Sequence, residues 1–217
     1  MTVSNSIDRL APSHDDPAHI VKGRARLVRA ATKLFREKSY HSTSIGDVAR
    51  EADISVGAVY LYIKTKSDLL VLLFNNVVEE YQSRVLMISE LDGTATDKLR
   101  TAITEYYSVL DDHHAKTEIM YHEYGAMESD ARAYIRRVED DLESAIYKIL
   151  VSGVEAGEFT SVDARLYARN ILWLGHLWAL NRGGVRSSMT IDQFTAEQID
   201  FFLRALVAPT SGQESAS

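Results

Sequence analysis

The chain has no cysteine and only three prolines in its 217 residues. Without cysteine it can form no disulfide, no thiolate nucleophile and no thiolate-bound zinc site. The prolines are Pro12, Pro17 and Pro209, so proline bars no segment between residues 18 and 208 from forming a helix.

Long apolar runs are also missing. The longest nearly apolar segment, Ile171–Leu180, is about half the length of a membrane span. The first twenty residues lack the basic start and the apolar run of a signal peptide. Apolar residues make up 46 % of the chain and charged residues 25 %, as in an ordinary globular protein. We therefore expect a soluble, cytoplasmic protein with no membrane partner.

The net charge of −7 is unevenly distributed along the chain. Between Lys22 and Asp68, ten basic and five acidic residues give a net charge of +5. Residues 69–217 hold thirteen basic and 23 acidic residues, which give a net charge of −10. A basic N-terminal module on an acidic body is typical of a protein that binds DNA with one domain and regulates that binding with another.

Apolar residues recur with a helical period along most of the chain, and no strand pattern or internal repeat stands out. Gly157 and the pair Gly183-Gly184 predict helix stops. Three pairs fit the capping pattern at helix starts: Ser44 with Asp47, Thr65 with Asp68, and Thr190 with Gln193. The sequence predicts an all-α fold of about nine helices, which begin near residues 23, 44, 55, 65, 96, 115, 130, 163 and 190.

The segment Thr43–Lys66 predicts a helix-turn-helix, because two short capped helices with a tight turn between them follow an amphipathic helix. Asp53 falls in the turn, where we expect a left-handed backbone, which Asp tolerates better than most residues. Gly57 lies near the start of the second short helix and lets its backbone approach DNA closely. That helix is the one expected in the major groove.

A set of residues between Arg24 and Phe74 carries a family pattern. These residues are Ala30, Ala31, Leu34, Phe35, Thr43, Ser44, Ile45, Val48, Ala49, Ala52, Ile54, Ser55, Gly57, Tyr60, Tyr62, Lys66, Asp68, Leu69 and Leu70. The segment resembles the DNA-binding domain of the TetR family of bacterial transcriptional regulators. It departs from the pattern at Asp53, where the family usually has glycine, and at Ile63, where it usually has phenylalanine.

The resemblance implies an all-α homodimer whose C-terminal domain binds a small molecule that releases the N-terminal heads from DNA. We expect a repressor on a palindromic operator of double-stranded DNA, with a small hydrophobic effector and no cofactor, although the residues themselves do not decide between repressor and activator. The segment His122–Arg132 weakly resembles members that respond to acyl-CoA or other lipid-like effectors, and an aromatic effector is equally open. We expect a flexible arm at 1–21, a DNA-binding domain at 22–68, an effector-binding and dimerisation domain at 69–208, and a disordered tail at 209–217.

The candidate DNA-binding residues combine helix-turn-helix positions, tyrosine hydroxyls and lysines. Arg24 and Arg26 could add phosphate contacts, and Ser44 and Ser55 fit a purely structural role as helix caps equally well. The small and apolar side chains suit thymine methyl groups rather than guanine. The candidates are Ser44, Gly46, Ser55, Val56, Gly57, Ala58, Tyr60, Leu61, Tyr62, Lys64 and Lys66.

The C-terminal part holds the candidate effector and dimer residues. Apolar pockets with a few polar groups are the usual small-molecule sites, so the excess of aromatic residues predicts an apolar cavity without charged walls. Each residue fits a place in the ordinary core as well. The effector candidates are Phe74, Tyr81, Tyr106, Tyr107, Tyr121, Tyr124 and Trp173. The dimer candidates are Leu172, Leu177, Trp178, Phe202 and Leu206.

Rival interpretations rest on weaker patterns. His114, Glu118 and His122 are four residues apart and could bind a metal on one helix face, but ordinary surface histidines are favoured and no metal is expected. His176 is expected to be a hydrogen-bonded core or interface histidine rather than a catalytic base. A helical enzyme that processes small molecules is the first alternative, yet no GxSxG or phosphate-binding loop occurs. An architectural DNA-binding protein is the second, and the acidic body disfavours it.

Overall fold

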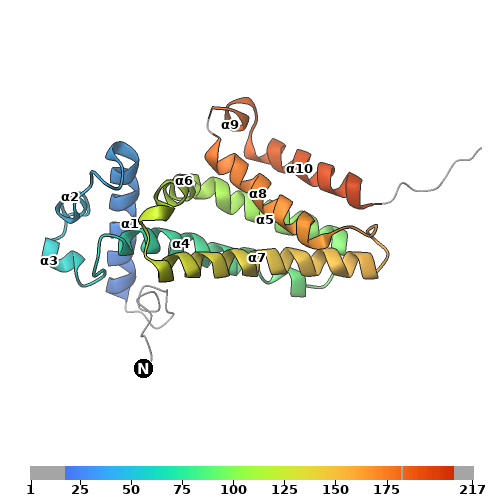
Figure 1. Ribbon diagram of the computed structural model, residues 1–217, viewed down its shortest axis with the longest axis horizontal. Helices are drawn as coiled ribbons and strands as arrows, with labels where there is room; N and C mark the ends of the chain where they lie inside the picture. The colour runs from blue at the N-terminus through green and yellow to red at the C-terminus, as the bar shows by residue number, and fades with distance from the viewer. Residues whose placement is uncertain (1–17, 182, 208–217) are drawn as a thin grey trace, which may run out of the picture.

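The computed structural model describes residues 18–181 and 183–207, and over these ranges it contains helices and no strand (Figure 1). The α-helices are α1 (Ala18–Lys38), α2 (Ile45–Glu51), α3 (Val56–Val59), α4 (Asp68–Arg84), α5 (Ala95–Asp112), α6 (His114–Glu123), α7 (Ser129–Glu155), α8 (Ala164–Leu180), α9 (Val185–Ser188) and α10 (Ile191–Leu206). Two 3₁₀ turns, Ile88–Glu90 and Tyr124–Ala126, follow α4 and α6. The described ranges thus hold ten α-helices instead of about nine, and the additional one is the single turn α9.

Helix α1 begins at Ala18, five residues before the predicted start at Gly23. Residues 18–21, which were expected in the flexible arm, are therefore helical. Gly23 does not end the helix but makes room for a neighbour, since a Cβ atom there would come within 2.1 Å of the Tyr62 hydroxyl. The rest of the predicted arm, and the predicted tail at 209–217, lie outside the described residues.

Two of the three predicted capping pairs are confirmed as caps, whereas the third, Thr65 with Asp68, lies just before α4, whose N-cap residue is Ser67. Ser44 and Thr190 each form a complete capping box, with Asp47 and Gln193 respectively. The carboxylate of Asp68 accepts hydrogen bonds from the backbone N–H groups of Lys64 and Thr65, at 2.7 and 3.1 Å. These bonds satisfy backbone donors that have no partner inside a helix.

Two apolar cores share helix α4. Leu69, Leu70 and Leu73 pack in the core of α1, α2 and α3, which also contains side chains of α6 and α7. Val77 and Tyr81, one or two turns later, belong to the core of α5, α7, α8 and α10. The expected domain boundary after residue 68 is therefore no boundary in packing, because the first half of α4 completes the core of the N-terminal head.

Helix α8 lies between α7 and α10 in the view of Figure 1. This position buries four of the five predicted dimer residues inside the chain itself: Leu172, Trp178, Phe202 and Leu206. Trp178 donates a hydrogen bond from Nε1 to the Asp111 carboxylate at 2.8 Å, and its ring packs on Phe194. Those four residues form core rather than an exposed interface, since α10 covers one face of α8. Leu177 remains exposed.

Within the ranges that the structure describes, no helix is both long enough and apolar enough to cross a membrane.

Candidate functional site

An arginine of α1, Arg26, is hydrogen-bonded to the turn between α2 and α3 of the helix-turn-helix. Asp53 has a φ of +53°, so the predicted left-handed turn residue is confirmed. Arg26 donates hydrogen bonds to the backbone carbonyls of Ala52 and Asp53, at 3.1 and 2.8 Å. The guanidinium group, which the sequence suggested for phosphate contacts, holds the turn between α2 and α3 in place.

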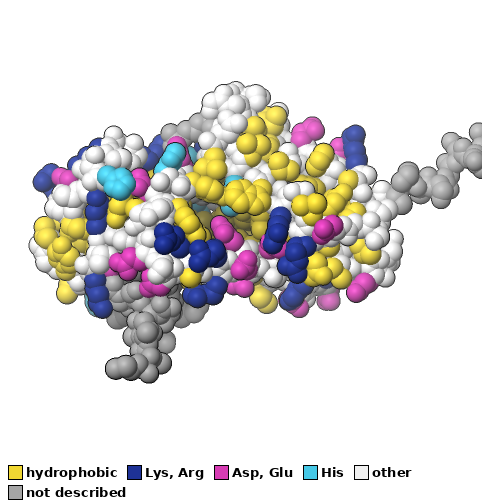
Figure 2. Space-filling view, in the orientation of Figure 1, with side chains coloured by type: hydrophobic (Ala, Val, Ile, Leu, Met, Phe, Trp, Pro, Cys, Tyr) yellow, Lys and Arg dark blue, Asp and Glu magenta, His cyan; other side chains and the backbone are white. Residues whose placement is uncertain are grey.

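Most of the predicted DNA-binding side chains share the outer surface around α3. Leu61 is 78 % exposed, Tyr60 53 % and Val56 45 %, so several exposed apolar side chains occur together in this short segment. Hydrophobic side chains gather at this end of the molecule in Figure 2. The candidates on the exposed surface are Ser44, Ser55, Val56, Gly57, Tyr60, Leu61 and Lys64.

Other candidates also serve the fold of the head. The hydroxyls of Ser44 and Ser55 each accept a hydrogen bond at 3.1 Å, from the backbone N–H of Asp47 and Ala58. Tyr62 packs on Gly23, and Ala58 and Gly46 are half-buried. The structural role expected as an alternative for the two serines is confirmed.

Lys66 lies at the junction of the head with α4 rather than on the surface around α3. Its ammonium nitrogen is 4.2 Å from the centroid of the Tyr40 ring and donates to the carbonyl of His41 at 3.3 Å. Burial lowers the pKa of Lys66, while the Glu123 carboxylate opposes this shift. An ammonium group has three donors, so the bond to His41 leaves hydrogen-bonding capacity for a phosphate.

The head also contacts the body through His41 and Glu123. Nε2 of His41 lies 3.4 Å from Oε2 of Glu123, the last residue of α6. A shift of α6 therefore acts on the loop that also holds Lys66.

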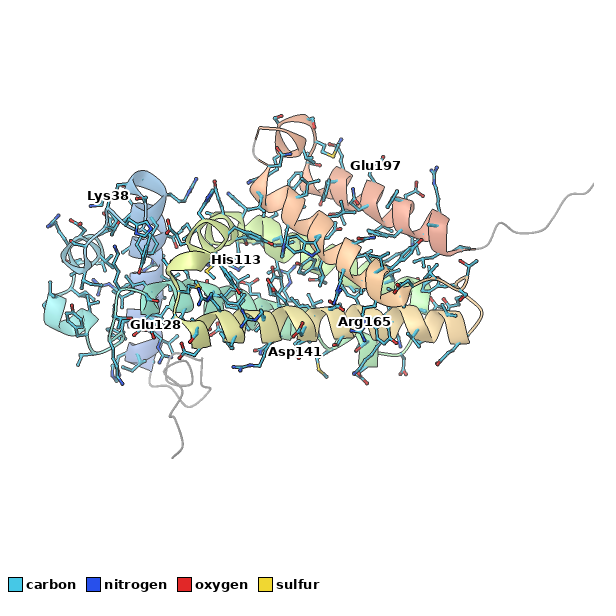
Figure 3. All side chains as sticks on the ribbon, viewed as in Figure 1. Lys38, His113, Glu128, Asp141, Arg165 and Glu197 are labelled. Carbon is cyan, nitrogen blue, oxygen red and sulfur yellow. The ribbon has the colours of Figure 1, made fainter. Side chains whose placement is uncertain are left out.

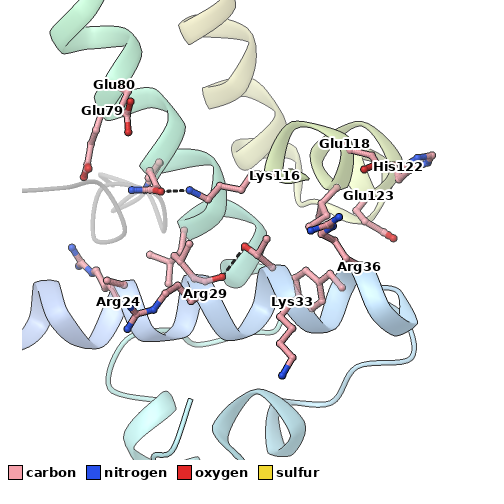
Figure 4. A pocket seen from close by; sticks show the side chains of 18 of the residues that line it. Arg24, Arg29, Lys33, Arg36, Glu79, Glu80, Lys116, Glu118, His122 and Glu123 are labelled. Atoms are coloured by element: carbon pink, nitrogen blue, oxygen red, sulfur yellow. Dashed lines mark hydrogen bonds between the residues drawn. The ribbon is translucent and has the colours of Figure 1, made fainter. Parts of the chain in front are cut away.

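A large cleft opens between α1 on one side and α4 and α6 on the other (Figure 4). Its walls carry charges of both signs, so this cleft is not the predicted apolar cavity. Arg24 and Arg29 of α1 lie on the side of Glu79 and Glu80 of α4, whereas Arg36 lies near Glu118 and Glu123 of α6 (Figure 4). Lys116 of α6 donates a hydrogen bond to Asn76 at its edge.

None of the predicted effector residues lines this cleft. Tyr134, which does line it, is in ring contact with the effector candidate Phe74. Tyr81, Tyr106 and Tyr107 are buried in the core of the body, and side chains fill the space between its helices in Figure 3. Phe74 packs partly buried against both cores. Tyr121 and Tyr124 are half-buried, while Trp173 is 61 % exposed.

His176 connects two of these tyrosines. Its Nε2 is hydrogen-bonded to the Tyr106 hydroxyl at 2.7 Å, and its Nδ1 to the Tyr121 hydroxyl. Burial lowers the pKa of His176 from 6.5 to about 4, so the imidazole is neutral near pH 7. The expectation of a hydrogen-bonded core histidine is confirmed, but the sequence did not indicate its partners, which lie 70 and 55 positions away.

In the part of the chain that the structure describes, no group of three His, Asp or Glu side chains could hold a metal ion. Nδ1 of His114 is 2.6 Å from the backbone carbonyl of Asp111, and His122 is exposed at the rim of the charged cleft.

The low pKa of His176 predicts a specific dependence of stability on pH. Between pH 6.5 and 4 the unfolded chain binds a proton at this histidine and the folded chain does not, so the free energy of unfolding decreases as the pH falls. The full loss is up to ~3 kcal/mol. We expect His176→Gln to reduce the proton uptake on unfolding by about one, measured by denaturant titrations across this pH range. His122→Gln is the control at an exposed histidine, and an unchanged slope in His176→Gln would contradict the burial argument.

Comparison with known proteins agrees with both parts of the fold. Residues 27–73 match the model of "Bacterial regulatory proteins, tetR family". Residues 92–206 match "Tetracyclin repressor-like, C-terminal domain". The HTH-type transcriptional regulator HbdR of Aromatoleum sp. (strain CIB) is 30 % identical over 89 % of this chain and 83 % of its own length.

Solved structures have the same fold. FadR from Bacillus subtilis in complex with stearoyl-CoA has a TM-score of 0.66 and 20 % identity, over 83 % of this chain and 98 % of its own. AibR in complex with isovaleryl coenzyme A and operator DNA has a TM-score of 0.69 and 17 % identity, over 82 % of this chain and 97 % of its own. These matches, with the helix-turn-helix and the helical body, show that the chain belongs to the TetR family of transcriptional regulators and is not an enzyme.

Proposed function

We propose that this regulator is a repressor that binds a palindromic operator as a homodimer and is released by a small, mostly apolar effector. The observation that carries the proposal is the core shared between head and body. Side chains of α6 and α7, such as Met120 and Ile135, pack in the same cluster as Leu27 and Val59 of the head. An effector that moves these helices therefore changes the position of the helix-turn-helix.

The surface around α3 supports DNA recognition by two kinds of contact. Val56 and Leu61 are exposed apolar side chains that suit thymine methyl groups in the major groove. Lys64 is exposed, and Lys66 keeps free donors, so both can attract phosphates without reading sequence.

These roles predict opposite effects of two substitutions. We expect Lys64→Ala to weaken binding to operator and random DNA about equally and to reduce the salt slope by about one per head. We expect Leu61→Ala to weaken operator binding more than random binding, because it removes an apolar base contact. The operator is first obtained by selecting bound sequences from random oligonucleotides, and each variant is then titrated with salt on both DNAs.

Lys148→Ala is the matched control, since Lys148 is an exposed lysine paired with Glu90 on the body. If Lys64→Ala lost the preference for operator over random DNA while Leu61→Ala had no effect, the surface around α3 would not be the one that contacts the bases.

The exposed apolar side chains of α8 and α10 support the dimer. Leu166, Trp173, Leu177 and Leu180 recur at helical spacing on one face of α8, and Phe201 of α10 is 62 % exposed. An apolar face of this size in a chain with a charged surface is typical of a contact between copies. Leu177 is the one predicted interface residue that belongs to this face.

We expect the double variant Leu177→Glu/Phe201→Glu to be a folded monomer with weaker operator binding, because the charges would be buried without partners in the interface. Sedimentation equilibrium and helical circular dichroism test this expectation. Met87→Glu, at an exposed apolar residue outside both helices, should remain dimeric. Substituting the buried Trp178 and Phe202 would instead unfold the chain. A dimer that persists in the double variant rejects this interface.

Acyl-CoA is the effector class that the comparisons support best, since AibR and FadR were solved with isovaleryl and stearoyl thioesters of coenzyme A. The aromatic side chains of α4, α5, α6 and α8 would provide apolar contacts to the acyl chain.

Binding to the native chain should raise its melting temperature by mass action, and we expect the same acyl-CoA to weaken operator binding. Thermal shift and operator titration over a series of acyl chain lengths measure both effects. Coenzyme A without an acyl group is the control. An acyl-CoA that raises the melting temperature but leaves operator affinity unchanged would reject release by this effector.

A further inference from the structure

Four helices bring hydrogen-bonding side chains together inside the apolar body. Tyr81 comes from α4, Tyr106 from α5, Tyr121 from α6 and His176 from α8. The rings of Tyr81 and Tyr106 are 5.3 Å apart, and His176 is hydrogen-bonded to Tyr106 and Tyr121 at its two ring nitrogens. A buried polar group is costly unless it is hydrogen-bonded, and both ring nitrogens of His176 have a hydrogen-bond partner.

Counting hydrogens shows that the three hydrogen-bonded side chains Tyr106, His176 and Tyr121 have one donor to spare. A neutral imidazole has one N–H donor and one acceptor nitrogen. One of the two tyrosines therefore donates its hydroxyl hydrogen to His176, and the other accepts a hydrogen bond from it. Burial raises the pKa of both Tyr106 and Tyr121, so both hydroxyls keep their hydrogens. The accepting tyrosine retains a hydrogen that His176 does not receive.

Of the two tyrosines that are hydrogen-bonded to His176, Tyr121 is the one that a ligand can reach. Tyr106 is 1 % exposed, while Tyr121 is half-buried. The face of the molecule in Figure 2 is hollowed between α6 and α7, with hydrophobic side chains toward α6 and charged side chains toward α7. Among the described residues the Tyr121 hydroxyl has no hydrogen-bond partner other than His176. An acceptor placed beside Tyr121 would select the arrangement in which Tyr106 donates to His176.

We propose that the Tyr121 hydroxyl, oriented by His176, donates a hydrogen bond to the thioester carbonyl oxygen of an acyl-CoA effector. The inference rests on the proposed effector site in the body and adds the group that recognises the polar end of the ligand. Tyr121 is then a specificity-determining residue, and His176 is a positioning residue.

The test uses two probes with the same hydrocarbon chain: an acyl-CoA and the corresponding S-alkyl-CoA thioether, which lacks the carbonyl oxygen. Affinities are measured on the full chain by isothermal titration calorimetry. We expect the acyl-CoA to bind about threefold to tenfold more tightly than the thioether, as for one neutral hydrogen bond. Tyr121→Phe should abolish this ratio.

Tyr107→Phe is the matched control. It also removes one hydroxyl from the core, but that hydroxyl donates to the backbone carbonyl of Ile171 at 3.0 Å and lies away from the Tyr121 end. Both variants lose a buried hydrogen bond, so a general loss of stability affects both. We expect only Tyr121→Phe to lose the preference for the carbonyl compound.

Each other outcome overturns the inference in a distinct way. Equal affinity of acyl-CoA and thioether for the native chain removes the carbonyl contact but leaves the regulator and its effector class intact. A ratio that survives in Tyr121→Phe assigns the contact to another residue. If neither probe binds, the inference fails together with the proposed effector class, while selection of operator DNA still tests the regulator itself.

Discussion

The continuous apolar surface of α4 is the constraint on which the rest of the structure depends. Leu70 and Leu73 close the core of the head, and Val77 and Tyr81 close the core of the body. Removing a buried leucine costs roughly 2–5 kcal/mol, so neither core can release α4 cheaply. Head and body are therefore joined by a rigid helix rather than by a flexible linker, and a displacement of one end is felt at the other.

Polar contacts tie the outer side of α4 to its neighbours. Arg84 bonds to Glu105 of α5 at 2.7 Å, and Glu80 to His113, between α5 and α6, at 2.8 Å. Partly exposed ion pairs of this kind contribute little to stability singly, but they fix the orientation of helices whose apolar faces already pack. At the other end of α6, Glu123 contacts His41 of the head. Helix α6 thus contacts both α4, through Lys116 and Asn76, and the loop of the head that contains His41.

The hydrogen bonds from Tyr106 through His176 to Tyr121 also join different helices of the body. Both nitrogens of the imidazole are hydrogen-bonded, which offsets the cost of placing it in an apolar core. The three side chains come from α5, α6 and α8, so the geometry of these hydrogen bonds depends on the relative positions of the three helices. A ligand that bonds to one end can therefore stabilise one arrangement of the body over another.

The sequence by itself determined what depends on neighbours along the chain. Helical periodicity, the capping boxes at Ser44 and Thr190, and the left-handed turn at Asp53 are local, and all three were predicted correctly. Only the tertiary structure decided which apolar side chains of α8 and α10 are buried, because α8 is apolar on nearly every side and its period favours no face. It buried Trp178 and left Leu177 exposed, bound Arg26 to the turn and Lys66 to His41, and paired His176 with Tyr106 and Tyr121. These outcomes join residues far apart in the sequence, and a pattern of neighbouring residues carries no information about such contacts.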